Sequence, residues 1–176
     1  QPGPTECGPG TYMNQGGQVS CKDCRAGTFA NTTGVSACVE SMPGFFASGA
    51  RQQAQRVCPA GQYADQGGTA KCEDCQAGTY QDQEGQLECQ TASPGFQVPS
   101  ARAITEMPCP VGEFNTQGGQ RTCNRCYDDL DDYGPAYTTS GPGSTRCDRC
   151  QPRYFMDVSG SICLQCDLNK MNCTLA

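Results

Sequence analysis

Histidine and tryptophan are absent from this 176-residue sequence, and Val, Ile and Leu together number only 14. Without histidine the chain lacks the commonest general base and every catalytic triad built on one. With so few aliphatic side chains it cannot bury enough apolar surface to offset the conformational entropy lost on folding. We therefore expect neither an enzyme nor an ordinary hydrophobic core.

Long apolar runs are lacking too, and no stretch approaches the length of a membrane span. No signal peptide is recognisable, and we interpret the chain as part of a longer secreted or surface protein. The formal charge of −6 argues against nucleic acid and anionic membranes as partners.

Cysteine, in contrast, is abundant, with 16 residues. This content is typical of a disulfide scaffold and indicates an oxidising compartment, extracellular or at the cell surface. The even number suits full pairing. We expect the bridges to supply the stability that a core does not, and we expect no cofactor.

A period of seventeen residues organises the chain. The motif Cys-x-x-Gly-x-aromatic begins at Cys7 and returns, and its glycines are Gly10, Gly27, Gly44, Gly61, Gly78, Gly95 and Gly112. A fixed period predicts a stack of equivalent units, each contacting mainly its neighbours.

Every third unit lacks both of its cysteines. Ser41 and Gln55 occupy the two positions in one copy, and Ala92 and Glu106 occupy them in the next. A longer period of three units follows. It predicts the end of a preceding repeat at 1–6, triplets at 7–57 and 58–108, the start of a third at 109–125 and a divergent cysteine-rich end at 126–176.

The joint loss of positions fourteen apart leaves no odd cysteine and favours pairing at that separation. The predicted bridges are Cys7–Cys21, Cys24–Cys38, Cys58–Cys72, Cys75–Cys89 and Cys109–Cys123, followed by Cys126–Cys147, Cys150–Cys163 and Cys166–Cys173. Sequence alone leaves other connectivities open.

Turn-forming residues lie between the aromatic and the second cysteine of each unit, as in Asp65-Gln66-Gly67-Gly68. Glycine there permits the positive φ that tight reversals need. We expect small disulfide-rich repeats in an elongated stack, mostly irregular with short β-hairpins and little or no helix. The recurring aromatics should pack on the disulfides or on the neighbouring unit.

The string Cys58-Pro59-Ala60-Gly61-x-Tyr63, with cysteines fourteen and seventeen residues on, resembles the ephrin-receptor-like cysteine-rich repeat. It is also similar to the first submodule of tumour-necrosis-factor-receptor domains. The resemblance runs from about Cys7 to Cys126. It implies a secreted or ectodomain location, disulfides within each submodule and a role in spacing, adhesion or ligand contact.

Two metal-site hypotheses compete with this interpretation. The pairs Cys123/Cys126 and Cys147/Cys150 have zinc-ribbon-like spacing, but zinc would not explain the isolated Cys38. The acidic run at 128–132 lacks the spacing and the glycine of a calcium loop. We favour disulfides and a solvated acidic loop, with no metal.

Two kinds of surface site are predicted. Asn31-Thr32-Thr33 and Asn172-Cys173-Thr174 are N-glycosylation acceptors. Where other units have a turn glycine, the cystine-free units have an arginine. We therefore predict an assembly contact in these units, formed by Arg51, Arg102, Phe45, Phe46 and Phe96.

The strict unit length favours a structural protein, a rigid extracellular rod, spacer or filament component, because a stack with constant rotation tolerates no insertion. Its partners would be other copies of itself or other extracellular proteins. The alternative is a ligand-binding ectodomain of a receptor, with the acidic segment 127–146 as a recognition loop.

Overall fold

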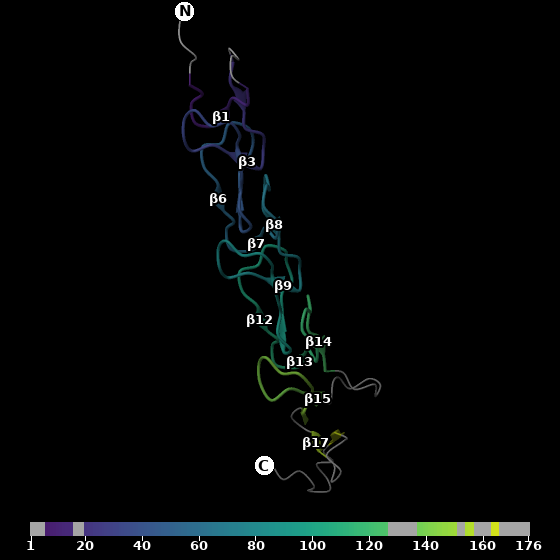
Figure 1. Cartoon of the computed structure of the whole chain (residues 1–176). Helices are drawn as coiled ribbons and strands as arrows, with labels where there is room; N and C mark the ends of the chain where they lie inside the picture. The colour runs from purple at the N-terminus through teal and green to yellow at the C-terminus, as the bar shows by residue number, and fades with distance from the viewer. Residues whose placement is uncertain (1–5, 16–19, 127–136, 151–153, 157–162, 166–176) are drawn as a thin grey trace, which may run out of the picture. The chain divides into compact units, whose positions relative to one another are not determined.

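A computed structural model describes residues 6–15, 20–126, 137–150, 154–156 and 163–165. These residues contain no helix. They form eighteen strands of two or three residues, paired into nine two-stranded sheets (Figure 1). The prediction of small disulfide-rich repeats with short hairpins is confirmed.

Each strand pairs with one neighbour in sequence, β1 with β2 and so on to β17 with β18. The strands are β1 (Thr11–Tyr12), β2 (Lys22–Asp23), β3 (Thr28–Phe29), β4 (Val39–Glu40), β5 (Phe45–Phe46), β6 (Arg56–Val57), β7 (Gln62–Tyr63), β8 (Glu73–Asp74), β9 (Thr79–Tyr80), β10 (Gln90–Thr91), β11 (Phe96–Gln97), β12 (Met107–Pro108), β13 (Glu113–Phe114), β14 (Asn124–Arg125), β15 (Tyr137–Thr138), β16 (Arg149–Cys150), β17 (Tyr154–Met156) and β18 (Cys163–Gln165).

The chain divides into two compact units. The first comprises Gln1–Gln76, Tyr80–Gln90 and Ala101–Thr105, and the second comprises Ala77–Thr79, Thr91–Ser100 and Glu106–Ala176. The triplet boundaries at 7–57 and 58–108 stay a prediction.

A repeated set of backbone hydrogen bonds joins successive repeats within the first unit. The Gly27 N–H donates to the Ala47 carbonyl, and the Gly27 carbonyl accepts from the Ser41 N–H. The turn residue reaches back further, because the Arg51 N–H donates to the Cys24 carbonyl. Equivalent bonds recur with the seventeen-residue period, so each repeat fixes the next through its main chain.

The periodic glycine is required where a later repeat crosses it. Gly61 has φ +81°, and a Cβ on it would lie 2.5 Å from the Arg102 carbonyl oxygen, closer than real Cβ atoms come. We call the residue at the turn between the two strands of a repeat its tip residue, as Arg51, Gly68 and Gly85 are. A Cβ on Gly10, Gly27 or Gly44 would likewise come too close to the carbonyl oxygen of the tip residue two repeats ahead. The seventeen-residue period therefore reflects a backbone crossing that leaves no room for a side chain.

The buried apolar residues of the described chain are cysteines, alanines and one valine, Val98. The first cysteine of a repeat is almost fully buried, as at Cys24, Cys58 and Cys75. One cluster joins Cys58, Cys72 and Ala64, with Phe46 packed against it. The disulfides thus take the place in the interior that aliphatic side chains have in other domains.

The repeat continues in the second unit beyond Cys126 with seven additional residues. Cys126 and Cys147 are 21 residues apart, against 14 in the earlier bridges. The Gly143 N–H donates to the Cys109 carbonyl, the bond that turn residues make elsewhere. The Thr139 hydroxyl accepts from the Gly112 N–H, where other repeats use a main-chain carbonyl. Residues 137–150 therefore keep the hydrogen-bonding pattern of the repeats before them.

Candidate functional site in the cystine-free repeats

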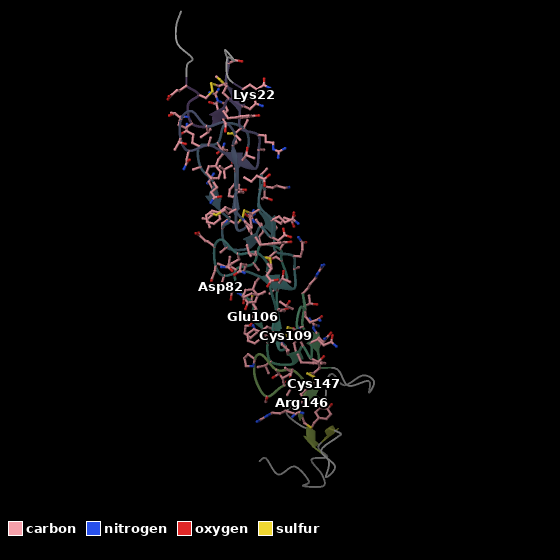
Figure 2. The ribbon with its side chains drawn as sticks, viewed as in Figure 1. Lys22, Asp82, Glu106, Cys109, Arg146 and Cys147 are labelled. Carbon is pink, nitrogen blue, oxygen red and sulfur yellow. A yellow bond between two sulfur atoms is a disulfide. The ribbon has the colours of Figure 1, made fainter. Side chains whose placement is uncertain are left out.

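The structure contains the five predicted bridges with a separation of fourteen residues, and also Cys126–Cys147 (Figure 2). Their Cα atoms lie 5.6–5.8 Å apart, within the normal range for cystine. Cys150 is also disulfide-bonded. The predicted partner Cys163 and the pair Cys166–Cys173 have side chains outside the described residues.

These bridges decide against the zinc hypothesis. Cys123 is bonded to Cys109 and Cys126 to Cys147, so neither sulfur is a free thiolate ligand. In the part of the chain that the structure describes, no group of three or more His, Cys, Asp or Glu residues could hold a metal ion. The acidic run at 128–132 lies outside the described residues.

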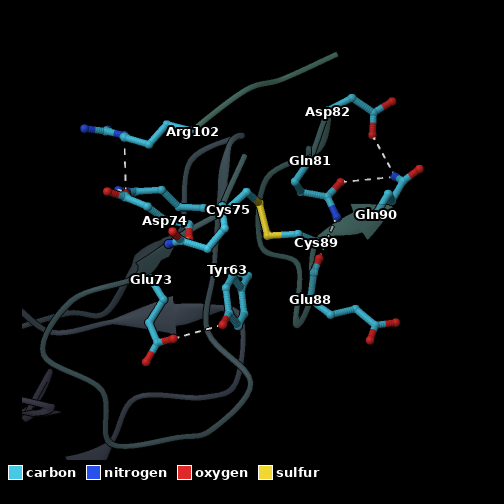
Figure 3. The surroundings of a disulfide bond; sticks show 12 residues. Tyr63, Glu73, Asp74, Cys75, Gln81, Asp82, Glu88, Cys89, Gln90 and Arg102 are labelled. Atoms are coloured by element: carbon cyan, nitrogen blue, oxygen red, sulfur yellow. Dashed lines mark hydrogen bonds and ion pairs between the residues drawn. A yellow bond between two sulfur atoms is a disulfide. The ribbon is translucent and has the colours of Figure 1, made fainter. Parts of the chain in front are cut away.

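Polar side chains surround the Cys75–Cys89 bridge (Figure 3). The Gln81 amide is almost fully buried and donates to the Glu88 carbonyl at 2.8 Å. The Tyr63 hydroxyl donates to the Glu73 carboxylate at 2.9 Å, and this hydrogen bond raises the pKa of the phenol. Hydrogen bonds between polar groups thus help to organise the surroundings of this bridge.

A side-chain hydrogen bond spans each cystine-free repeat at the place of the missing bridge. The Met42 N–H donates to the Gln55 side-chain oxygen at 2.7 Å. The Ser93 N–H donates to the Glu106 carboxylate at 2.6 Å. We call these two contacts the clasps. Each clasp joins residues thirteen apart, so a weaker, breakable contact closes the loop that a disulfide closes elsewhere.

A small buried side chain takes the place of the first cysteine of each missing bridge. Ser41 is 1% exposed, and its hydroxyl accepts from the Thr69 N–H at 3.1 Å and donates to the Thr69 carbonyl. In the second cystine-free repeat Ala92 fills this place and is equally buried. Small side chains therefore replace the first cysteine without leaving an unpaired polar group.

The two tip arginines adopt a left-handed backbone conformation. Arg51 has φ 60° and Arg102 has φ 61°, and they are the non-glycine residues with positive φ in the described chain. An L-residue in this region costs roughly 1–2 kcal/mol compared with ordinary backbone. Glycine occupies the same position in other repeats, at Gly34, Gly68 and Gly85.

Each tip arginine forms an ion pair inside the same chain. Arg51 Nε lies 3.5 Å from an Asp23 carboxylate oxygen, and Arg102 Nε lies 3.4 Å from Asp74. The arginine side chains stay 68% and 61% exposed. Exposed pairs of this kind contribute roughly 0–1 kcal/mol, which does not exceed the roughly 1–2 kcal/mol cost of the strained backbone.

The tip of a repeat faces the second strand of the hairpin two repeats earlier. A Cβ on the tip residue Gly68 would meet the carboxylate of Glu40 in β4. The two arginines meet their aspartates at the same separation along the sequence. An ion pair with that strand thus forms in the two repeats whose tip residue is arginine.

The three phenylalanines predicted for the assembly contact are half-buried. Phe46 packs on the cystine cluster described above, and the Arg56 guanidinium lies 5.5 Å from its ring centroid. Phe45 pairs with Val57 across β5 and β6. In the second unit the Phe96 ring lies beside Gly143, since a Cβ placed on this glycine would be 3.8 Å from the ring. Contacts within one chain thus account for part of the burial of the Phe46 and Phe96 rings.

Asn31 lies at an exposed position directly after the buried Ala30. Thr32 and Thr33 are exposed as well. The second predicted acceptor, Asn172, lies outside the described residues.

The hairpins, the bridges and the repeat period together define a disulfide-rich repeat protein. Residues 61–107 match the family model described as tyrosine-protein kinase ephrin type A/B receptor-like. This match confirms the resemblance to the ephrin-receptor-like cysteine-rich repeat. No curated protein matches the chain. Among the described residues, no helix has the length and apolar character needed to cross a bilayer.

Proposed function

We propose that the chain is a non-enzymatic structural repeat of an extracellular protein, serving as a rigid spacer or filament component. The main support for this proposal is the recurring set of main-chain hydrogen bonds. Gly27 is hydrogen-bonded to residues 41 and 47, and Arg51 is hydrogen-bonded to Cys24. One repeat cannot rotate against the next without breaking these bonds. Such a unit transmits geometry from repeat to repeat.

The composition of the interior supports the extracellular location. Bridged cysteines are the commonest buried residues of the described chain, and disulfides persist in oxidising compartments. The ephrin-receptor-like match at residues 61–107 supports the same location.

Inserting one further triplet tests the spacer function. A second copy of residues 58–108, placed after residue 108, should lengthen the particle in proportion to the chain, by about 29%, because repeats add along one axis. A compact domain, whose radius grows as the 0.38 power of length, would gain about 10%. Small-angle X-ray scattering measures the maximal dimension of both chains.

The control carries the inserted segment in scrambled order, which should unfold and broaden the scattering profile. A gain no larger than that of a compact domain, with all bridges formed, would contradict the spacer proposal. Specific capture of a soluble partner by a chain that shows no linear growth would favour the receptor ectodomain instead.

The assembly contact at the cystine-free repeats is a further part of this proposal. The Nε atoms of Arg51 and Arg102 face Asp23 and Asp74, and both side chains remain largely exposed. Their remaining guanidinium donors suit carboxylates of a second copy, whose net charge is −6. The strained backbone at both tips favours a role beyond stability.

The double substitution Arg51→Gly with Arg102→Gly should abolish self-association and leave the folded chain intact. Glycine suits the left-handed tip, so the unfolding free energy should stay the same or rise, because the strain removed at each site, roughly 1–2 kcal/mol, is at least as large as the ion pair lost, roughly 0–1 kcal/mol. Sedimentation equilibrium measures the assembly mass. Arg25→Ala is the matched control, because Arg25 is also an exposed ion-paired arginine, with Glu40. Equal assembly mass for the double variant and the natural chain would refute the contact.

A further inference from the structure

In each repeat the aromatic residue is followed by one residue that faces inward and then by one that faces outward, as in Phe29, Ala30 and Asn31. We call this outward-facing position the outer rim. In the first unit this position holds Asn14, Asn31, Ser48, Asp65 and Asp82, all exposed. The residues before the last four, Ala30, Ala47, Ala64 and Gln81, are all buried. Side chains at the rim therefore face solvent in repeat after repeat.

Asn31 is the rim residue whose neighbours also suit glycosyl transfer. Thr33 stands two residues on, giving the acceptor sequence Asn-x-Thr. Among the described residues no hydrogen bond engages the Asn31 amide, and residues 32–34 form a bend. Its amide nitrogen is thus accessible and uncommitted.

The bend is held at both of its ends. The Ala30 N–H donates to the Gln52 carbonyl, and the Gly34 N–H donates to the Cys7 carbonyl. Between these anchors, residues 31–33 make no main-chain bond to another of the described repeats. A large polar group on Asn31 can therefore be carried without disturbing the bonds between repeats.

The other described asparagines do not combine these features. Asn14 is followed by Gly16 at the required position and accepts a hydrogen bond from Lys22. Asn115 is fully buried. Asn124 donates to Asn115, and the residue two positions on is a bridged cysteine.

We propose that Asn31 carries an N-linked oligosaccharide on the outer rim of the first unit. The Asn31 amide nitrogen forms a bond to the anomeric carbon of an oligosaccharide donated by a polyisoprenoid diphosphate. The bond from that carbon to the diphosphate oxygen breaks, the diphosphate leaves, and the amide nitrogen loses one proton. The proposal rests on the extracellular location given above and not on the spacer role.

A glycan at this place also constrains assembly. It would keep a neighbouring surface away from the rim at residues 31–33 through its bulk and hydration. The contact proposed for Arg51 and Arg102 does not use those residues.

The test is secretion of the full chain from insect cells behind a cleavable signal sequence. Intact mass and peptide maps are compared before and after treatment with an amidase that removes N-glycans. We expect one oligosaccharide on the peptide containing Asn31, with conversion of Asn31 to Asp on release. Asn31→Gln and, separately, Thr33→Val should each lose it completely. Thr33→Ser should retain it.

A gain variant separates failure of the site from failure of the compartment. Ser48→Asn with Ala50→Thr builds the same sequence at the rim of the next repeat, where residues 48 and 50 are exposed. We expect a second oligosaccharide in this variant. A glycan on residue 48 with none on Asn31 overturns the proposal and leaves the extracellular location standing. Absence of glycan at both positions, in secreted and fully bridged protein, also overturns it.

Discussion

Complete reduction should convert the chain from a folded repeat protein into a disordered one. A bridge that closes a loop of about fifteen residues contributes roughly 3 kcal/mol in the chain-entropy model. Loss of even two such bridges removes about 6 kcal/mol, which is comparable to the whole stability of a typical domain. The buried residues that would remain are mainly alanines and cysteines, and they cannot replace that contribution.

Hydrogen exchange of the amides that join successive repeats is the sharpest measurement. In the oxidised chain the N–H groups of Gly27, Ser41 and Arg51 should be protected, because each donates to a carbonyl in another repeat. After reduction and alkylation all three should exchange at the rate of an unstructured peptide. Retained protection at these amides would show that hydrogen bonds and packing hold the repeats without the bridges.

The bridges themselves followed from sequence, because two positions fourteen apart were lost together. Ser41 with Gln55, and Ala92 with Glu106, left no single cysteine behind, and partners three apart would have stranded Cys38 and Cys58. The short hairpins followed from the aromatic and the turn glycine of each repeat. These features are local, since a repeat carries them within its own seventeen residues.

The crossing of repeats two steps apart was not predicted. Gly10 meets the Arg51 carbonyl and Gly61 meets that of Arg102, two repeats ahead in each case. Periodic glycines indicate that something requires them, but the period alone does not show which repeat comes close. That information arises only when three repeats stack in space.

The role of the tip arginines was predicted as a contact outside the chain, and the structure adds a partner within it. The signal was present in the sequence, because Asp23 precedes Arg51 by the same separation as Asp74 precedes Arg102. Sequence alone does not show that a tip residue lies against a strand two repeats earlier, so this separation did not predict an ion pair. The residues that form the clasps with their side chains were likewise noticed only as lost cysteines.

Between Cys7 and Cys147, the bridges leave two places where an oxidised chain can lengthen under tension. From Cys7 to Cys147 the shortest covalent path passes through each disulfide bond and does not include the loop that the bridge closes. Between bridges it passes through short Cys-x-x-Cys segments, except from Cys38 to Cys58 and from Cys89 to Cys109. These two stretches contain the cystine-free repeats. Hydrogen bonds, including the clasps, and packing of side chains such as Phe46 hold them closed in place of a covalent bridge.

Pulling the oxidised chain between residues 6 and 146 should therefore release length in two equal steps. Each stretch spans twenty residues, so each can extend to about 70 Å before its folded length is subtracted. The bridged repeats should stay closed, because their loops cannot open while the sulfur–sulfur bonds persist. Optical tweezers, with handles attached through unnatural amino acids at these two positions, measure the steps.

The matched variants place each step on a particular repeat. Ser41→Cys with Gln55→Cys supplies the missing bridge fourteen residues apart, and it should remove one of the two steps. Ser41→Ala with Gln55→Ala breaks the clasp and the Ser41 contacts, so both steps should remain while one of them occurs at lower force. Two undiminished steps in a variant whose new bridge is confirmed by mass spectrometry would show that the length comes from elsewhere. With the expected result, the cystine-free repeats are the extensible elements of the chain between Cys7 and Cys147.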